Sequence, residues 1–145
     1  MTSSNAVAPR RSARIVLICT ILYWCILFAA THVPGPRLPP IPVTDKTAHT
    51  ISYALLATGL FLSLHRRGRR APSQIAVIVL GTLLAYGAID ELSQIPVHRS
   101  CEMADWNADA AGAGMAVVLM TAALTWRENR RGPLATRRGF DILPK

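Results

Sequence analysis

Hydrophobic and polar positions follow one another in long blocks along this chain. Four apolar runs are separated by short polar or charged segments. At a rise of 1.5 Å per residue, about 20 residues span the roughly 30 Å hydrocarbon core of a bilayer, and a helix satisfies its own backbone hydrogen bonds in lipid. The pattern therefore predicts an all-α, polytopic membrane protein, an antiparallel bundle of four transmembrane helices. The runs cover residues 15–33, roughly 47–64, roughly 74–95 and roughly 105–126.

The polar ends of the chain frame one domain. Residues 1–12 are polar and small, and we expect a disordered cytoplasmic N-terminus there. Residues 13–127 form the predicted four-helix membrane domain. Residues 128–145 are basic and contain Gly132 and Pro133, two residues that disfavour helix interiors, so we expect a mobile cytoplasmic tail.

Charge is scarce and unevenly placed. Only 17% of residues are charged, against about 25% in typical soluble domains. Of the 16 basic residues, 13 lie before the first run, between runs two and three, or after run four. The positive-inside rule then places both termini in the cytoplasm of a multi-pass protein of the inner or plasma membrane.

The net charge of +8 raises the question of nucleic acid as a partner. No aromatic residues are interleaved with the arginines, as single-strand binding would require, so no nucleic-acid partner is predicted. The basic segments are better explained as topology signals that also attract anionic membrane lipid.

The first run has a second interpretation, a cleaved signal peptide. It follows a basic segment and contains "FAAT", which resembles a small-residue cleavage site. Its apolar region is longer than the usual 7–15 residues, which favours a retained membrane helix.

Small residues recur on one side of run four. Ala108, Gly112 and Ala116 are spaced four apart. Small residues let membrane helices approach closely. This strip predicts close packing within the monomer, and a homodimer through the same strip is the alternative.

Three polar motifs stand at the same predicted end of the bundle. They are "DKTAHTISY", "DELSQ" and "ADWNADAAG", and each contains two polar residues four positions apart, which share a helix face. Six of the eight acidic residues lie on this outer side or in the outer half of a helix. The pairs are Asp45 with His49, Asp90 with Gln94, and Asp105 with Asp109.

Carboxylates near the end of an apolar run need partners or a watery cleft. An ion-pair lock between helices would use Lys46, His49 and Arg99 as cations. The acids in the motifs outnumber these cations. The surplus suggests a divalent metal ion, a cationic ligand group or protonated carboxyl groups. The predicted ligand-binding residues are Asp45, Lys46, His49, Asp90, Glu91, Gln94, Arg99, Asp105 and Asp109, and the catalytic candidates are Asp90, Glu91 and His49.

The same motifs resemble the VanZ family of small integral membrane proteins. The resemblance covers roughly residues 45–114: an Asp-Lys-x-x-His box, an Asp-Glu-x-x-Gln box, and an Arg that leads to Asp-x-x-x-Asn/Asp-x-x-Gly. Family members commonly carry an aromatic residue and often Pro-Gly-Arg between the Gln and the Arg, whereas this chain has "IPVHR". A ligand that meets this loop would therefore differ.

The resemblance implies a protein that acts on or near a cell-envelope component. The founding member is associated with low-level resistance to teicoplanin-type glycopeptides. A lipid-linked cell-wall precursor would be the partner, with Arg99 holding a phosphate or carboxylate and a divalent ion bridging to a pyrophosphate.

Two other functions remain open from the residues. A metal-assisted hydrolase of a lipid-linked phosphate would use His49 as a ligand and Glu91 or Asp90 as general base. The spacing from Arg99 to Asp105 and Asp109 is similar to the Arg-x5-His-x3-Asp box of lipid phosphatases, but the nucleophilic His is replaced by Asp105. Intramembrane acids also suit a proton relay or transporter, although four spans leave little room for alternating access.

Other residues are expected to be structural. Trp106 is predicted to anchor the helix at the membrane boundary. His32 ends its run with no ligand pattern nearby, and Cys101 is interpreted as a small loop residue.

Overall fold

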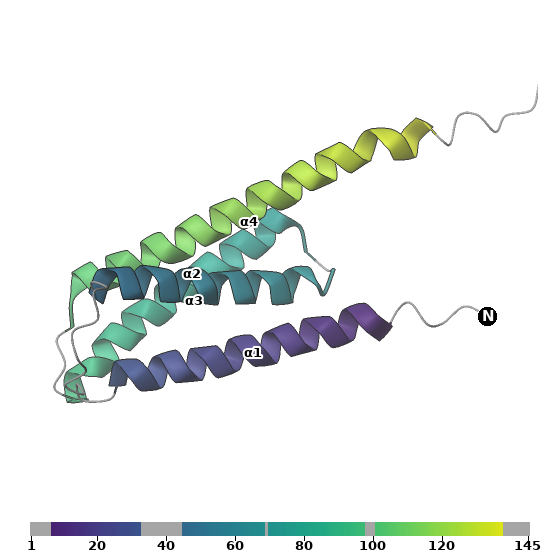
Figure 1. Cartoon of the computed structure of the whole chain (residues 1–145). Helices are drawn as coiled ribbons and strands as arrows, with labels where there is room; N and C mark the ends of the chain where they lie inside the picture. Colours follow the sequence, from purple (N-terminus) through teal and green to yellow (C-terminus); the bar gives the residue numbers. More distant parts are fainter. Residues whose placement is uncertain (1–6, 33–44, 69, 98–100, 138–145) are drawn as a thin grey trace, which may run out of the picture.

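Four long helices make up the fold, which confirms the predicted all-α four-helix bundle. The computed structural model describes residues 7–32, 45–68, 70–97 and 101–137. Each long helix contains a stretch that is long and apolar enough to cross a membrane. The helices are α1 (Val7–His32), α2 (Asp45–His65), α3 (Pro72–Gln94) and α4 (Met103–Arg137), and a short 3₁₀ turn (Ile95–Val97) follows α3 (Figure 1).

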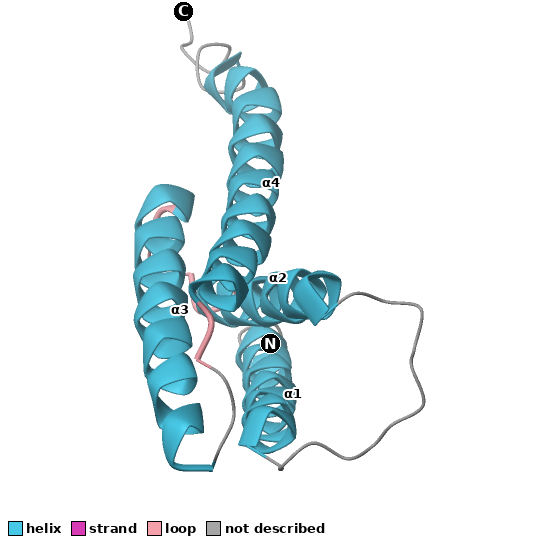
Figure 2. Cartoon of the chain, turned by 90° about the vertical axis from the view of Figure 1, so that its left-hand side faces the viewer, coloured by secondary structure: helices cyan, strands magenta, loops and turns pink. Residues whose placement is uncertain are grey.

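Consecutive helices run in opposite directions, so the two ends of the bundle differ in chemistry. α2 packs most extensively against α4, while α1 packs against α2 and more lightly against α3 (Figure 2). The acidic end holds the C-termini of α1 and α3 and the N-termini of α2 and α4. It carries Asp45, Asp90, Glu91, Glu102, Asp105 and Asp109; the basic end carries Arg11, Arg14, Arg66, Arg67, Arg70, Arg127 and Arg130.

On α2, α3 and α4 the core is built from residues four positions apart. On α3 one stripe of buried positions runs from Ile75 through Val79, Leu83 and Gly87 to Glu91. Residues at this spacing share one helix face. The stripe that forms the apolar core therefore leads directly into the carboxylates at the acidic end.

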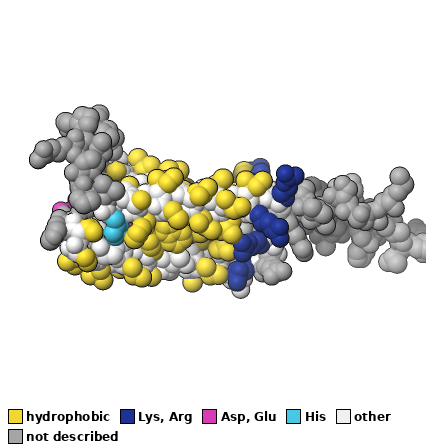
Figure 3. Space-filling view, turned by 90° about the horizontal axis from the view of Figure 1, so that it is seen from below, with side chains coloured by type: hydrophobic (Ala, Val, Ile, Leu, Met, Phe, Trp, Pro, Cys, Tyr) yellow, Lys and Arg dark blue, Asp and Glu magenta, His cyan; other side chains and the backbone are white. Residues whose placement is uncertain are grey.

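Large apolar side chains also cover the outside of the bundle. Ile26, Val77 and Leu119 are 67%, 74% and 70% exposed. Figure 3 shows an apolar surface between the acidic end and a belt of Lys and Arg side chains. In water an apolar surface of this kind would promote aggregation, whereas the lipid tails of a membrane solvate it well.

Two helices extend beyond their predicted limits. α1 begins at Val7, within the segment 1–12 for which disorder was expected, and Pro9 lies in its first turn, where the missing N–H costs little. α4 continues to Arg137, through Gly132 and Pro133, into the expected mobile tail. Several strong helix formers in residues 127–130 extend α4 beyond the apolar run.

α4 approaches the backbone of α2 very closely at Gly112. A Cβ atom placed on Gly112 would lie 2.0 Å from the carbonyl oxygen of Thr50 and 2.8 Å from its carbonyl carbon. The Thr50 hydroxyl donates to the carbonyl of Ala108 at 3.2 Å across the same contact. The small-residue strip therefore packs inside the monomer at this point, because only glycine allows the two backbones to approach so closely.

Replacing Gly112 with alanine should force α2 and α4 apart. We expect Gly112→Ala to reduce the free energy of unfolding by about 1–3 kcal/mol, the usual cost of overpacking. Gly114→Ala is the control, because a Cβ atom there meets nothing within 4 Å. Denaturant unfolding in micelles measures both, and equal stability of the two variants would contradict this description of the contact.

Candidate functional site

Asp90 and Glu91 are neighbours in sequence, yet they face different helices. Both are buried, with 2% and 4% of their surface exposed. Consecutive residues are separated by about 100° around a helix, since one turn takes 3.6 residues. Asp90 consequently meets α1, and Glu91 meets α4, so the polar groups of the acidic end form two networks.

The first network is centred on the Asp90 carboxylate and uses neutral donors. The hydroxyls of Thr31 and Tyr86 each lie 3.2 Å from Oδ1, and the Gln94 amide donates to Oδ2 at 3.3 Å. The bond between Asp90 and Gln94 matches the predicted i, i+4 pairing. Hydrogen bonds of this kind make a buried carboxylate tolerable at low dielectric.

The end of α1 is held by the same network. The Nε2 atom of His32 lies 2.8 Å from the Ser93 hydroxyl, and its Nδ1 atom lies 3.9 Å from Oδ1 of Asp90. One turn before Asp90 on α3, the ring of Tyr86 contacts Trp24 of α1 edge-on, with centroids 4.8 Å apart. These contacts attach α1 to α3, a role that the sequence did not suggest for His32.

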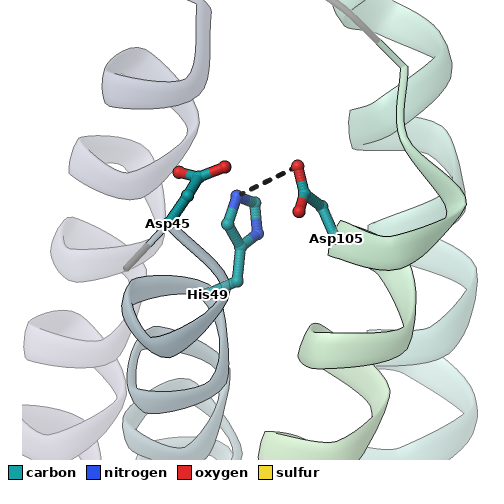
Figure 4. Close-up of side chains that lie close together, drawn as sticks. All are labelled: Asp45, His49 and Asp105. Atoms are coloured by element: carbon teal, nitrogen blue, oxygen red, sulfur yellow. Dashed lines mark ion pairs between the residues drawn. The ribbon is translucent and has the colours of Figure 1, made fainter. Parts of the chain in front are cut away.

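The second network joins α2 to α4 through a histidine. His49 Nδ1 lies 2.8 Å from Oδ1 of Asp109, and its Nε2 lies 4.0 Å from Oδ2 of Asp105. Figure 4 shows the ring between Asp45 of its own helix and Asp105 of α4. The i, i+4 pairs predicted on each helix thus meet across the contact between the helices.

Lys46 neutralises the outer part of this network. Its ammonium group pairs with Asp105 and lies 3.1 Å from Oε2 of Glu102. Its side chain is 46% exposed, so water competes for these ion pairs. Lys46 therefore belongs to the rim of the site, and the side chains of His49 and Asp109 lie deeper.

Glu91 approaches the second network from α3. Its Oε2 atom accepts a hydrogen bond from the backbone N–H of Glu102 at 2.9 Å. The Glu102 carbonyl in turn accepts from the N–H groups of Asp105 and Trp106 at the start of α4. The positive end of the α4 dipole therefore stabilises the Glu91 carboxylate.

Ligand atoms from these residues come together in two overlapping groups. In one, His49, Glu91 and Asp109 each offer an atom within 4.8 Å of the others; in the second, the same holds for Asp45, His49 and Asp105. Imidazole nitrogen and carboxylate oxygen are ligands for divalent transition metals. Both groups could hold such an ion, and they share His49.

An apolar cavity of about 290 Å³ adjoins the acidic end between α3 and α4. The Trp106 side chain forms part of its wall and is held by a hydrogen bond from Nε1 to the carbonyl of Leu84 at 3.1 Å. This contact gives Trp106 a defined place in the bundle in addition to its predicted anchoring role. The lining residues are Ala88, Glu91, Leu92, Cys101, Glu102, Met103 and Trp106.

The predicted ligand-binding residues thus divide into two sets. Asp90 meets α1 through Thr31, Gln94 donates to Asp90, and Arg99 lies outside the described residues. Thr31 and Tyr86 were not predicted from the sequence. The only signal for each was a hydroxyl group in the half of its apolar run that leads to the acidic end. The set that converges on α2 and α4 is Asp45, Lys46, His49, Glu91, Asp105 and Asp109.

Comparisons with known proteins add no further assignment. The chain matched no protein-family model, no characterised protein and no solved structure. The geometry of the acidic end and the motifs in the sequence are therefore the basis of the function proposed below.

We expect the two networks to be separable by mutation. Asp90→Ala removes the acceptor shared by three donors, so hydrogen exchange should accelerate in the last turn of α1. His49→Ala should instead accelerate exchange in the first turns of α2 and α4. Mass spectrometry of protein in micelles measures both, and identical exchange patterns in the two variants would show that the networks act as one unit.

Proposed function

We propose that this chain is a VanZ-like integral membrane protein that acts on or near a component of the cell envelope. The observation that carries the proposal is the placement of the second network beside the apolar cavity. Glu91 belongs to both, since it lines the cavity and lies within 4.8 Å of ligand atoms of His49 and Asp109. An amphiphilic molecule would find an apolar surface and polar partners side by side there.

The basic end supports a cytoplasmic location for both termini. The described arginines of the basic end lie on α1, on the α2–α3 connection and on α4, as the positive-inside rule requires of cytoplasmic segments. The acidic end would then lie on the extracytoplasmic side, in the inner or plasma membrane, where cell-wall precursors are exposed.

A lipid-linked cell-wall precursor fits this site by its chemistry. Its lipid tail would contact the cavity wall, which includes Leu92, Met103 and Trp106. Its phosphates would need cations, and Lys46 and a divalent ion held by the carboxylates would supply them. Binding of this kind would change the availability of the precursor and hence susceptibility to teicoplanin-type glycopeptides.

A metal-assisted membrane hydrolase is the second candidate, favoured by the two groups of metal-ligand atoms. The carboxylates and the imidazole would hold the ion, and the ion would supply Lewis-acid activation of water for hydrolysis of a lipid-linked phosphate. The His49 imidazole and the Glu91 carboxylate lie in one such group, whereas Asp90 faces α1. Of the three catalytic candidates, His49 and Glu91 are therefore the two that we assign to this chemistry.

The proposed orientation can be tested with the native cysteines. Cys101 is exposed at the acidic end, so a membrane-impermeant maleimide should label it in intact spheroplasts. Cys101→Ser should abolish this labelling, because Cys19 and Cys25 lie within the α1 span. Glu128→Cys in the Cys101→Ser background is the control and should react only after lysis. Labelling of Cys101 only after lysis would reverse the proposed orientation.

The proposed function is tested by glycopeptide susceptibility. Expression of the wild type in a sensitive host should raise tolerance to teicoplanin. We expect Glu91→Gln and His49→Gln to return tolerance to the empty-vector level at matched membrane abundance. Glu128→Gln removes an exposed carboxylate at the basic end and should behave as the wild type does. No effect of the wild type would remove the proposed role in susceptibility.

A further inference from the structure

We infer that His49, Glu91 and Asp109 form the binding site for one divalent metal ion of the Zn²⁺ type. Their ligand atoms lie within 4.8 Å of one another, and they come from three different helices, α2, α3 and α4. Ligands at about 2.0–2.1 Å from a tetrahedral ion lie about 3.3 Å apart. His49 Nδ1 and Asp109 Oδ1 are now 2.8 Å apart, so a shared ion would separate them by about 0.5 Å. Glu91 would approach from a distance of at most 4.8 Å.

Charge balance favours a dication at this position. Glu91 and Asp109 are 4% and 2% exposed, so their two negative charges are held away from water. Among the described residues the ion pairs of Lys46 go to Asp105 and Glu102, and none reaches Glu91. One divalent ion with a neutral imidazole cancels the two carboxylate charges, whereas a protonated His49 cancels only one.

A second, independent observation comes from Tyr53. Its side chain is 2% exposed, and its hydroxyl lies close to the Asp109 carboxylate without forming a well-aligned hydrogen bond to any of the described residues. A Cβ atom on Gly87 would lie 3.4 Å from this hydroxyl and 3.5 Å from Oδ2 of Asp109, so both oxygens face the same spot on α3. A buried hydroxyl without a well-aligned hydrogen bond is rare and costly. A water on the ion, or the reoriented Asp109 carboxylate, would satisfy it.

We call His49, Glu91 and Asp109 the inner group, and it is a better metal site than the outer group of Asp45, His49 and Asp105. Lys46 already neutralises Asp105, and Asp45 is exposed to solvent. A metal ion there would have to displace an ammonium group and would compete with water. The inner group has neither handicap, and its carboxylates lie on the core-facing stripes of α3 and α4.

The donor set leaves room for a further ligand. One nitrogen and two carboxylate oxygens from the protein are three ligands, the number found at zinc sites that keep an open position for water or substrate. Because Glu91 also lines the cavity, a molecule bound there would reach the edge of the metal site.

The test is metal binding by the full chain, purified in detergent and stripped with a chelator. Titration with Co²⁺, followed by visible absorption, and elemental analysis after Zn²⁺ loading should both give one ion per chain. Glu91→Gln and Asp109→Asn should weaken binding more than about 100-fold, beyond the effect of losing an outer partner of a ligand. Glu128→Gln, which removes an exposed carboxylate at the basic end, is the control and should bind as the wild type does, and Asp45→Asn distinguishes the two groups of ligand atoms.

Tyr53→Phe separates a metal site from a structural network. We expect this variant to bind Zn²⁺ about 10-fold more weakly, as for loss of an outer-shell hydrogen bond, yet to be at least as thermostable as the wild type without metal. Zn²⁺ should raise the melting temperature of the wild type but not of Glu91→Gln, which also shows whether that variant is folded. Failure of the folded wild type to bind Zn²⁺ or Co²⁺, or loss of binding in Asp45→Asn with retention in Glu91→Gln, would overturn the inference.

This inference does not depend on the proposed susceptibility function. A chain that binds one Zn²⁺ ion without altering teicoplanin tolerance would retain the metal site and lose that function. A chain that alters tolerance without binding metal would do the reverse, and its network would then be an ion-pair lock that a ligand approaches directly.

Discussion

The backbone contact between Gly112 and Thr50 sets the geometry of the acidic end. At this point nothing larger than hydrogen fits between α4 and the Thr50 carbonyl. His49 immediately precedes Thr50, and Asp109 lies three residues before Gly112, less than one turn away. The distance between the imidazole and the carboxylate is therefore fixed by how closely the two backbones approach. A longer side chain on α4 would separate the residues that the network requires to meet.

The acidic end also shows how a chain rich in apolar residues accommodates carboxylates. Asp90 is satisfied by neutral donors from α1 and from its own helix, and Glu91 accepts a backbone hydrogen bond at the start of α4. Neither arrangement uses a permanent cation of the described residues. Lys46 forms its ion pairs only with carboxylates at the rim, Glu102 and Asp105. The carboxylates near water are thus neutralised by an ammonium group. The deeper carboxylates are stabilised by hydrogen bonds and keep a negative charge that a ligand can neutralise.

The sequence predicted the helices and the convergence of three motifs, because both follow from periodicity. Apolar runs of membrane length fix the number of helices, and i, i+4 spacing fixes which polar side chains share a face. The divergence of Asp90 and Glu91 could not be predicted in this way. Which neighbour each meets depends on the packing of α3 between α1 and α4, and that packing is a property of the whole bundle. The contributions of Thr31 and Tyr86 were hidden for the same reason.

The partners of the two α3 carboxylates also appear in the chain in a particular order. Thr31 precedes Asp90 by 59 residues, whereas the Glu102 amide follows Glu91 by 11. During synthesis α1 enters the membrane first, so a partner for Asp90 is already in place when α3 leaves the ribosome. The partner of Glu91, the backbone N–H of Glu102, is synthesised only after α3. Insertion in chain order would thus pass through a stage with three helices in the membrane and Glu91 without its partner, and the last helix would complete both the fold and the site.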